Sequence, residues 1–432
     1  MLGVRCKTSL RLTPHALRVS HERKKRKEVL MRKILCGVLI FTFLFVIGVL
    51  QSGAAEKEVT YLSLADYTAA IAGLNVPGDM GTEDYFKDLN AKGGVDGVKV
   101  KFIGVDTRYD VARGVSAYKR YRAEPKLLVA NAIGTPIGKA VAPLATKDKI
   151  VQLVPGDGEF QAHIGRIFVW GPTYQDAFSA IVDWLLADWK KKGKTGMPKL
   201  GYISWDSAYG KEPLRGGKEY AEKMGVAMAP PEFFPPGTMD HTVYLSRLAK
   251  AEVNYIFAGG VDPTPTNVIR DAHKLGLTKT IQFFCDYWGP TSLGTRLHPE
   301  ALEGTVIVSY YIRGDDARKH PMANLWTKYG RGKLEDMNEV YTIGMIWAMT
   351  FEAGLKIALK EVGYKKLDGE AMYQAYQKLT GMKWAGLQGP CAYSPTSRRG
   401  SWEVRFYQVK AGKVTSISDW IKAPDAVSLH KF

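Results

Sequence analysis

The side chains most often used for catalysis and metal binding show no catalytic spacing along this chain. The sequence contains no G-x-S-x-G, HExxH or CxxC motif, and no G-x-G-x-x-G after a β-rich run. Triads are scattered in sequence, so this absence alone does not exclude an enzyme. After residue 55 the histidines lack metal-ligand spacing, and we expect structural or surface roles for His163, His241, His273, His298, His320 and His430. We therefore predict no catalytic residue, no metal, no cofactor and no enzymatic activity.

Thr135 has the position of a binding residue instead. It follows a β-rich run and precedes a helical pattern, so its hydroxyl and the adjacent amides are placed to receive an anionic or carbonyl group at a helix N-terminus. The alternative is a plain helix cap.

The elements that must position such residues alternate along the chain. Short β-rich runs alternate with longer helical patterns, which indicates α/β layers with parallel sheets. We expect strands over residues 59–64, 98–105, 127–132, 150–154, 200–204, 253–258, 281–284 and 305–310. We expect helices over residues 81–90, 112–121, 137–146, 177–190, 214–224, 242–250, 266–275, 339–360 and 369–379.

The net charge of +17 is concentrated at the N-terminus. Residues 1–55 contain eleven Lys and Arg but only two acidic residues, and the remainder carries a net +8 without a basic run interleaved with aromatics. This distribution argues against nucleic-acid binding.

The same N-terminal region contains a cationic start at Met31-Arg32-Lys33, an apolar run over 34–50 and small residues before position 56. This pattern is typical of a secretory signal, and we predict cleavage after Ala55, with residues 1–30 as a non-native extension. An uncleaved membrane anchor is the alternative, because the apolar run is near the lower limit of a spanning helix.

Several motifs occur in a fixed order after residue 57. They are LADYTA (64–69), NAKGGVDG (90–97), DTRYD (106–110), GTP (134–136), VPGDG (154–158), DSAYG (206–210), PGTMD (236–240) and Gly389-Pro390. In this order the chain resembles the leucine/isoleucine/valine-binding class of type I periplasmic binding proteins, over nearly all of residues 57–421.

The resemblance implies an α/β fold of two doubly wound, Rossmann-like lobes joined by a three-crossover hinge. We place lobe 1 at 57–177 and 307–400, lobe 2 at 178–306 and 401–421, and a C-terminal tail at 422–432. Ligands of such sheets bind outside the carboxyl ends of the strands, so a cleft between the lobes that closes by hinge motion is expected.

The resemblance also implies site residues. Thr135 and Pro136 match the first ligand-binding loop and Asp157 the second, where an acid would repel a ligand carboxylate unless it turns away as a cap. Tyr209 matches the tyrosine of the second lobe. The candidate acids for a ligand ammonium group are Asp286, beside Tyr287 and Trp288, and Asp262. Tyr67 and Leu74 match the apolar wall. Each has an alternative as a core residue, a helix cap or a surface charge.

The function implied is a monomeric periplasmic receptor that captures a small molecule and delivers it to the membrane permease of an ABC transporter. The ligand expected is a branched-chain or hydrophobic amino acid, or a related carboxylate, amide or aromatic compound. A membrane-tethered sensory ectodomain of the same fold is the alternative, and a secreted hydrolase lacks a nucleophile constellation. Cys285 and Cys391 fall in different predicted lobes, so we expect them to be unbridged.

Overall fold

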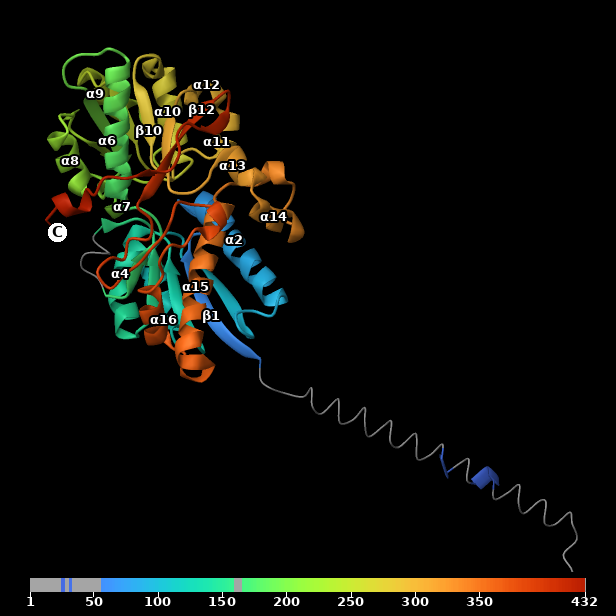
Figure 1. Cartoon of the computed structure of the whole chain (residues 1–432). Helices are drawn as coiled ribbons and strands as arrows, with labels where there is room; N and C mark the ends of the chain where they lie inside the picture. The colour runs from blue at the N-terminus through green and yellow to red at the C-terminus, as the bar shows by residue number, and fades with distance from the viewer. Residues whose placement is uncertain (1–24, 28–30, 33–55, 159–164, 432) are drawn as a thin grey trace, which may run out of the picture. The chain divides into compact units, whose positions relative to one another are not determined.

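The computed structural model describes residues 25–27, 31–32, 56–158 and 165–431. The chain divides into two units, Met1–Glu56 and Lys57–Phe432, and the second unit contains both of the sheets that build the fold (Figure 1). The predicted upstream extension, signal segment and cleavage point lie almost entirely outside the described residues.

The first lobe is built on sheet A, which is parallel throughout and has the order β2-β1-β3-β4-β5. Its strands are β1 (Lys57–Ala65), β2 (Val98–Asp106), β3 (Leu127–Ala132), β4 (Val151–Val154) and β5 (Ile167–Val169). Helices cover both of its faces: α2 (Ala72–Ala91), α15 (Tyr341–Lys366) and α16 (Gly369–Tyr376) on one, α3 (Val111–Tyr121) and α4 (Thr135–Lys147) on the other.

The second lobe is built on sheet B, of order β13-β12-β11-β10-β9-β6-β7, in which β12 and β13 are antiparallel to their neighbours. Its strands are β6 (Lys199–Trp205), β7 (Ala227–Met228), β8 (Glu232–Phe234), β9 (Tyr255–Ala258), β10 (Gln282–Cys285), β11 (Val306–Ser309), β12 (Glu403–Lys410), β13 (Lys413–Ser416) and β14 (Ile421–Lys422). Its main helices are α6 (Tyr174–Lys191), α7 (Ala208–Lys211), α8 (Leu214–Lys223), α9 (Thr242–Lys250), α10 (Thr264–Lys274), α11 (Ser292–Leu297), α12 (Pro299–Leu302) and α13 (Gly314–Lys319).

The expected doubly wound α/β fold is confirmed, and the eight expected strands are present to within about two residues at their ends. The chain passes between the sheets three times: after β5, after β11 and before β12. Sheet B includes β11 as far as Ser309, past the predicted limit of lobe 2 at residue 306. The lobe boundaries otherwise remain a prediction.

Helix α2 begins at Ala72, earlier than the predicted start at residue 81. Proline and glycine disfavour a helix intrinsically, and α2 contains Pro77, Gly78 and Gly81. The glycines are needed because α15 lies directly against this helix: a Cβ at Gly81 would overlap the carbonyl oxygen of Tyr341, and a Cβ at Gly344 would overlap that of Gly78. Tertiary packing therefore overrides local propensity here.

Helix α15 is long and apolar enough to cross a membrane, and it is the one described helix of which this is true. Most of its apolar stretch is buried inside the protein against α2 and α16. Such burial is typical of the central helix of a folded core.

Cys285 and Cys391 are both free and buried, and burial raises the pKa of each thiol, that of Cys391 to about 12. The thiolate is the reactive form, so we expect neither cysteine to react with a thiol reagent in the native protein that begins at Glu56. Two groups should react after denaturation without reductant. A count of zero in the denatured monomer would reveal a disulfide and contradict the structure.

Candidate ligand-binding cleft

The two sheets share one strand order at their centres. In sheet A the first strand, β1, lies between β2 and β3, and in sheet B the first strand, β6, lies between β7 and β9. Loops that leave neighbouring strands toward opposite faces open a crevice at the carboxyl ends of those strands. In sheet A, β1 leads to α2 on one face and β3 leads to α4 on the other. The crevice of sheet A is therefore expected between β1 and β3, and that of sheet B between β6 and β9.

A cavity lies where these two crevices meet. It has about 290 Å³ of space between atoms, part of it open to solvent, and only about 20 Å³ admits the centre of a water molecule. Space of that size holds roughly one water, so the wall residues must move apart to admit a larger ligand. The wall consists of Ile71, Leu74, Tyr109, Ile133, Gly134, Thr135, Pro155, Tyr174, Tyr209, Val261 and Trp288.

The N-terminus of α4 forms the polar part of this wall. Gly134 is the N-cap residue, with a φ of 120° that favours glycine, and it makes no side-chain capping bond. Thr135 is 1% exposed, and its hydroxyl has no hydrogen-bond partner among the described residues. Pro136 occupies the first turn, where its missing N–H costs nothing. The first amides of a helix have no acceptor within it, so this end of α4 offers donors to an anion.

Four aromatic residues form part of the remaining wall: Tyr109, Tyr174, Tyr209 and Trp288. The rings of Tyr174 and Tyr209 meet edge to face, with centroids 5.0 Å apart. The indole N–H of Trp288 donates to the Tyr174 hydroxyl at 3.0 Å. These contacts join Tyr174, at the start of α6, to Tyr209 and Trp288 in the segments after β6 and β10, and they hold the rings against one another.

Asp286 lies behind the aromatic wall. The Tyr209 hydroxyl donates to Asp286 Oδ2 at 2.8 Å, with the carbonyl oxygen of Gly260 3.1 Å away, and the Trp288 amide donates to Asp286 Oδ1 at 2.9 Å. Burial raises the pKa of the Asp286 carboxyl to about 7. The carboxylate therefore positions Tyr209 and Trp288 and does not form part of the cavity surface.

A second, smaller cavity adjoins the first through Leu74, Val261 and Trp288, and Asp262 and Tyr287 line it. Asp262 Oδ1 accepts a hydrogen bond from Thr266 at 2.7 Å, and Oδ2 accepts one from Thr291 at 2.7 Å. Burial raises the pKa of Asp262. Both carboxylate oxygens are thus held by neighbouring hydroxyl groups.

The ten residues expected from the sequence divide into three groups. Leu74, Thr135, Tyr209 and Trp288 line the first cavity, and Asp262 and Tyr287 line the second. Tyr67, Pro136, Asp157 and Asp286 line neither cavity.

Two residues of the last group, Tyr67 and Asp157, have contacts elsewhere. The Tyr67 hydroxyl donates to Asp79 at 2.6 Å. Asp157 is fully buried, and Lys139 Nζ lies 3.8 Å from its carboxylate, so its charge has a cation beside it.

The sequence patterns did not indicate Ile71, Tyr109, Ile133, Gly134, Pro155, Tyr174 or Val261 as wall residues. A signal existed for Tyr109, which lies in the motif over 106–110 directly after β2, and for Gly134 and Pro155, which lie in the loop motifs over 134–136 and 154–158. Tyr174 begins α6 after the first crossover, and nothing local distinguishes it from a core tyrosine.

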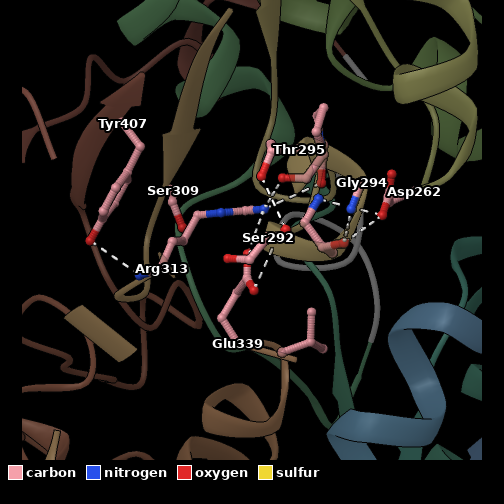
Figure 2. Close-up of polar contacts among 12 residues, drawn as sticks. Asp262, Ser292, Gly294, Thr295, Ser309, Arg313, Glu339 and Tyr407 are labelled. Atoms are coloured by element: carbon pink, nitrogen blue, oxygen red, sulfur yellow. Dashed lines mark hydrogen bonds and ion pairs between the residues drawn. The ribbon is translucent and has the colours of Figure 1, made fainter. Parts of the chain in front are cut away.

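A buried charge pair joins the lobes beside the cavities (Figure 2). Arg313 and Glu339 are both 0% exposed, with Arg313 Nη2 3.5 Å from Glu339 Oε1. Glu339 precedes α15 of the first lobe, and it accepts the Ser292 amide at the start of α11 in the second lobe at 3.0 Å. A second interlobe pair, Lys139 on α4 with Glu212 after α7, lies at 3.6 Å.

Among the described residues, no group of three or more histidine, cysteine, aspartate and glutamate side chains is placed to hold a metal ion.

Comparison with known proteins gives a consistent set of relatives. The model of a family described as periplasmic binding protein matches residues 63–413. The Leu/Ile/Val-binding protein BraC3 of Rhizobium johnstonii is 21% identical over 374 residues, which cover 84% of this chain and 94% of the relative.

Two solved structures share the fold. A branched-chain amino-acid ABC transporter protein from Thermus thermophilus with bound valine has a TM-score of 0.78 and 19% identity, over 87% of this chain and 99% of that one. A solute-binding protein from R. palustris in complex with 4-hydroxybenzoate has a TM-score of 0.73 and 18% identity, over 86% of this chain and 99% of that one.

Proposed function

The chain belongs to the periplasmic binding protein family, and from this premise we propose that it is the extracytoplasmic substrate-binding component of an ABC importer. It captures a small molecule between its lobes and presents the closed complex to a membrane permease. Its relatives include a Leu/Ile/Val-binding protein, which supports transport but leaves the ligand open. We propose that the protein acts as a monomer and is secreted by its N-terminal segment, with Glu56 as the mature amino terminus.

The observation that carries this proposal is the cavity at the meeting point of both crevices. Its wall combines a free helix N-terminus, an unpartnered buried hydroxyl and aromatic rings from both lobes. Ligand sites in proteins are typically apolar with a few placed polar groups. The donors at α4 fit a carboxylate group, and the rings fit an apolar body. Closure of the second lobe over a ligand held by α4 would bury both parts.

A thermal-shift screen tests the proposal. The panel contains amino acids, aromatic acids, amides and short-chain carboxylates. A ligand at a hundred times its dissociation constant stabilises the folded state by about 2.7 kcal/mol, which is readily seen as a rise in Tm. Absence of any shift across the panel would count against a receptor, and turnover of a bound compound would indicate an enzyme.

Thr135→Val should weaken the binding of a carboxylate ligand by about tenfold, because a hydrogen bond to a charged group contributes about 1.5–3 kcal/mol and the amides of α4 remain. The stability of the unliganded protein should be unchanged or slightly higher, because the Thr135 hydroxyl has no partner among the described residues. Thr135→Ser keeps the hydroxyl and serves as the control. Calorimetric titration with denaturant melts measures both quantities. A large loss of unliganded stability in Thr135→Val would instead assign the hydroxyl a structural role.

A further inference from the structure

Among the residues that the structure describes, which omit 159–164, the wall of the first cavity carries no side-chain charge. None of its eleven residues is aspartate, glutamate, lysine, arginine or histidine. The polar groups of the wall are the Thr135 hydroxyl, the first turn of α4 and the tyrosine hydroxyls, of which that of Tyr209 donates to Asp286 and that of Tyr174 accepts from Trp288. The described part of the wall therefore offers donors to an anion and no carboxylate to a cation.

The acids nearest the cavity are already engaged. Asp286 accepts from the Tyr209 hydroxyl and the Trp288 amide, and Asp262 accepts from two threonine hydroxyls. Asp66, in the loop after β1, accepts the amides of residues 68, 69 and 71. Each of these carboxylates shapes a loop of the cleft. An ammonium group would therefore have to share an acceptor that already binds the groups of the wall.

The electrostatic consequence is asymmetric. A ligand carboxylate that enters the closed site exchanges water for helix amides and the Thr135 hydroxyl. A ligand ammonium group loses its water without an anionic partner, and the transfer of an unpaired charge into such an environment is strongly unfavourable. The wall thus favours molecules with one negative group and no positive one.

The rest of the wall selects the body of the ligand. Four aromatic residues surround the space, and Ile71, Leu74, Ile133 and Val261 fill the gaps between them. Aromatic rings pair edge to face or offset with other rings, which contributes beyond the area that is buried. A planar aromatic body suits this wall better than a flexible polar one.

We propose that the cleft selects aromatic monocarboxylates that lack an amino group, in preference to amino acids. This inference rests on the proposed function and specifies its ligand class.

Matched pairs of compounds that differ only in the α-ammonium group test it. Calorimetric titration should compare 3-phenylpropanoate with L-phenylalanine, and 4-methylpentanoate with L-leucine. We expect the desamino member of each pair to bind at least about 100-fold more tightly, and 3-phenylpropanoate to bind more tightly than 4-methylpentanoate. Equal or tighter binding of the amino acids would overturn the ligand class and leave the receptor function standing. If none of the four compounds binds, the proposal that the cleft binds a carboxylate is wrong.

A substitution in the wall provides an independent measurement. Val261 lines both cavities, and Val261→Asp places a carboxylate among the rings. The preference for 3-phenylpropanoate over L-phenylalanine should fall at least about tenfold in this variant. Val261→Asn has nearly the same shape without the charge, and it should keep most of the preference. An equal fall in both variants would mean that polarity or shape, and not charge, determines the preference.

Discussion

Glu339→Ala should lower the free energy of unfolding by about 3–5 kcal/mol, the largest effect that we expect from a single polar substitution in this protein. Glu339 and Arg313 are both fully buried, so removal of the carboxylate leaves the guanidinium charge without its buried partner. The Ser292 amide loses its acceptor as well. Urea melts of the unliganded protein at neutral pH measure the change.

Two further variants separate charge burial from simple loss of contacts. In the double variant Arg313→Met with Glu339→Leu, both charges are replaced by apolar groups, and much of the lost stability should return because neither charge of the pair is left without its partner. Glu124→Ala removes a more exposed pair, Glu124 with Lys101 at 2.9 Å, and should cost no more than about 1 kcal/mol. A Glu339→Ala loss as small as that of Glu124→Ala would show that the buried pair contributes little.

Tyr209→Ala should reduce both stability and ligand affinity. The side chain is 4% exposed and its ring meets those of Tyr174 and Trp205, so its truncation should lower the free energy of unfolding by about 3–5 kcal/mol. Because Tyr209 also lines the cavity from the second lobe, ligand affinity measured on the folded fraction should fall by roughly 1–3 kcal/mol. The sequence alone presented these two roles as alternatives, and the structure gives the residue both positions.

Tyr209→Phe isolates the hydroxyl. The ring packing is kept, whereas Asp286 Oδ2 loses the donor that lies 2.8 Å away. We expect most of the ring's contribution to stability to remain. The preference for 3-phenylpropanoate over L-phenylalanine should change, because the Asp286 carboxyl no longer binds the Tyr209 hydroxyl.

Tyr118→Ala is the matched control for Tyr209→Ala, since Tyr118 is also buried but its hydroxyl donates to Asp148 at the C-terminal end of α4, the end opposite to the one that lines the cavity. It should lose stability and keep ligand affinity. Identical binding losses in Tyr118→Ala and Tyr209→Ala would remove Tyr209 from the site.

Much of the architecture could be predicted from local patterns. Buried parallel strands are continuous apolar runs, and the runs at 127–132 and 200–204 became β3 and β6. The structure also contains β5 and β12, which were not predicted. β5 has only the three residues Ile167–Val169, and it is stabilised by its pairing with β4 and with the crossover segment at Arg399. Such a strand has too few residues to show a period and exists through its neighbours.

The candidate site divides in the same way. The sequence by itself determined the layered α/β fold and the place of Thr135, because a loop between a parallel strand and its helix must lie at the carboxyl edge of the sheet. Only the tertiary structure decided that Tyr109 and Tyr174 face the cavity and that Asp286 stands behind Tyr209. Side-chain direction in a loop follows no period, and it is fixed here by contacts between segments far apart in the chain. The physical reason is that loops of both sheets form the wall of the cavity, and these loops are far apart in the sequence.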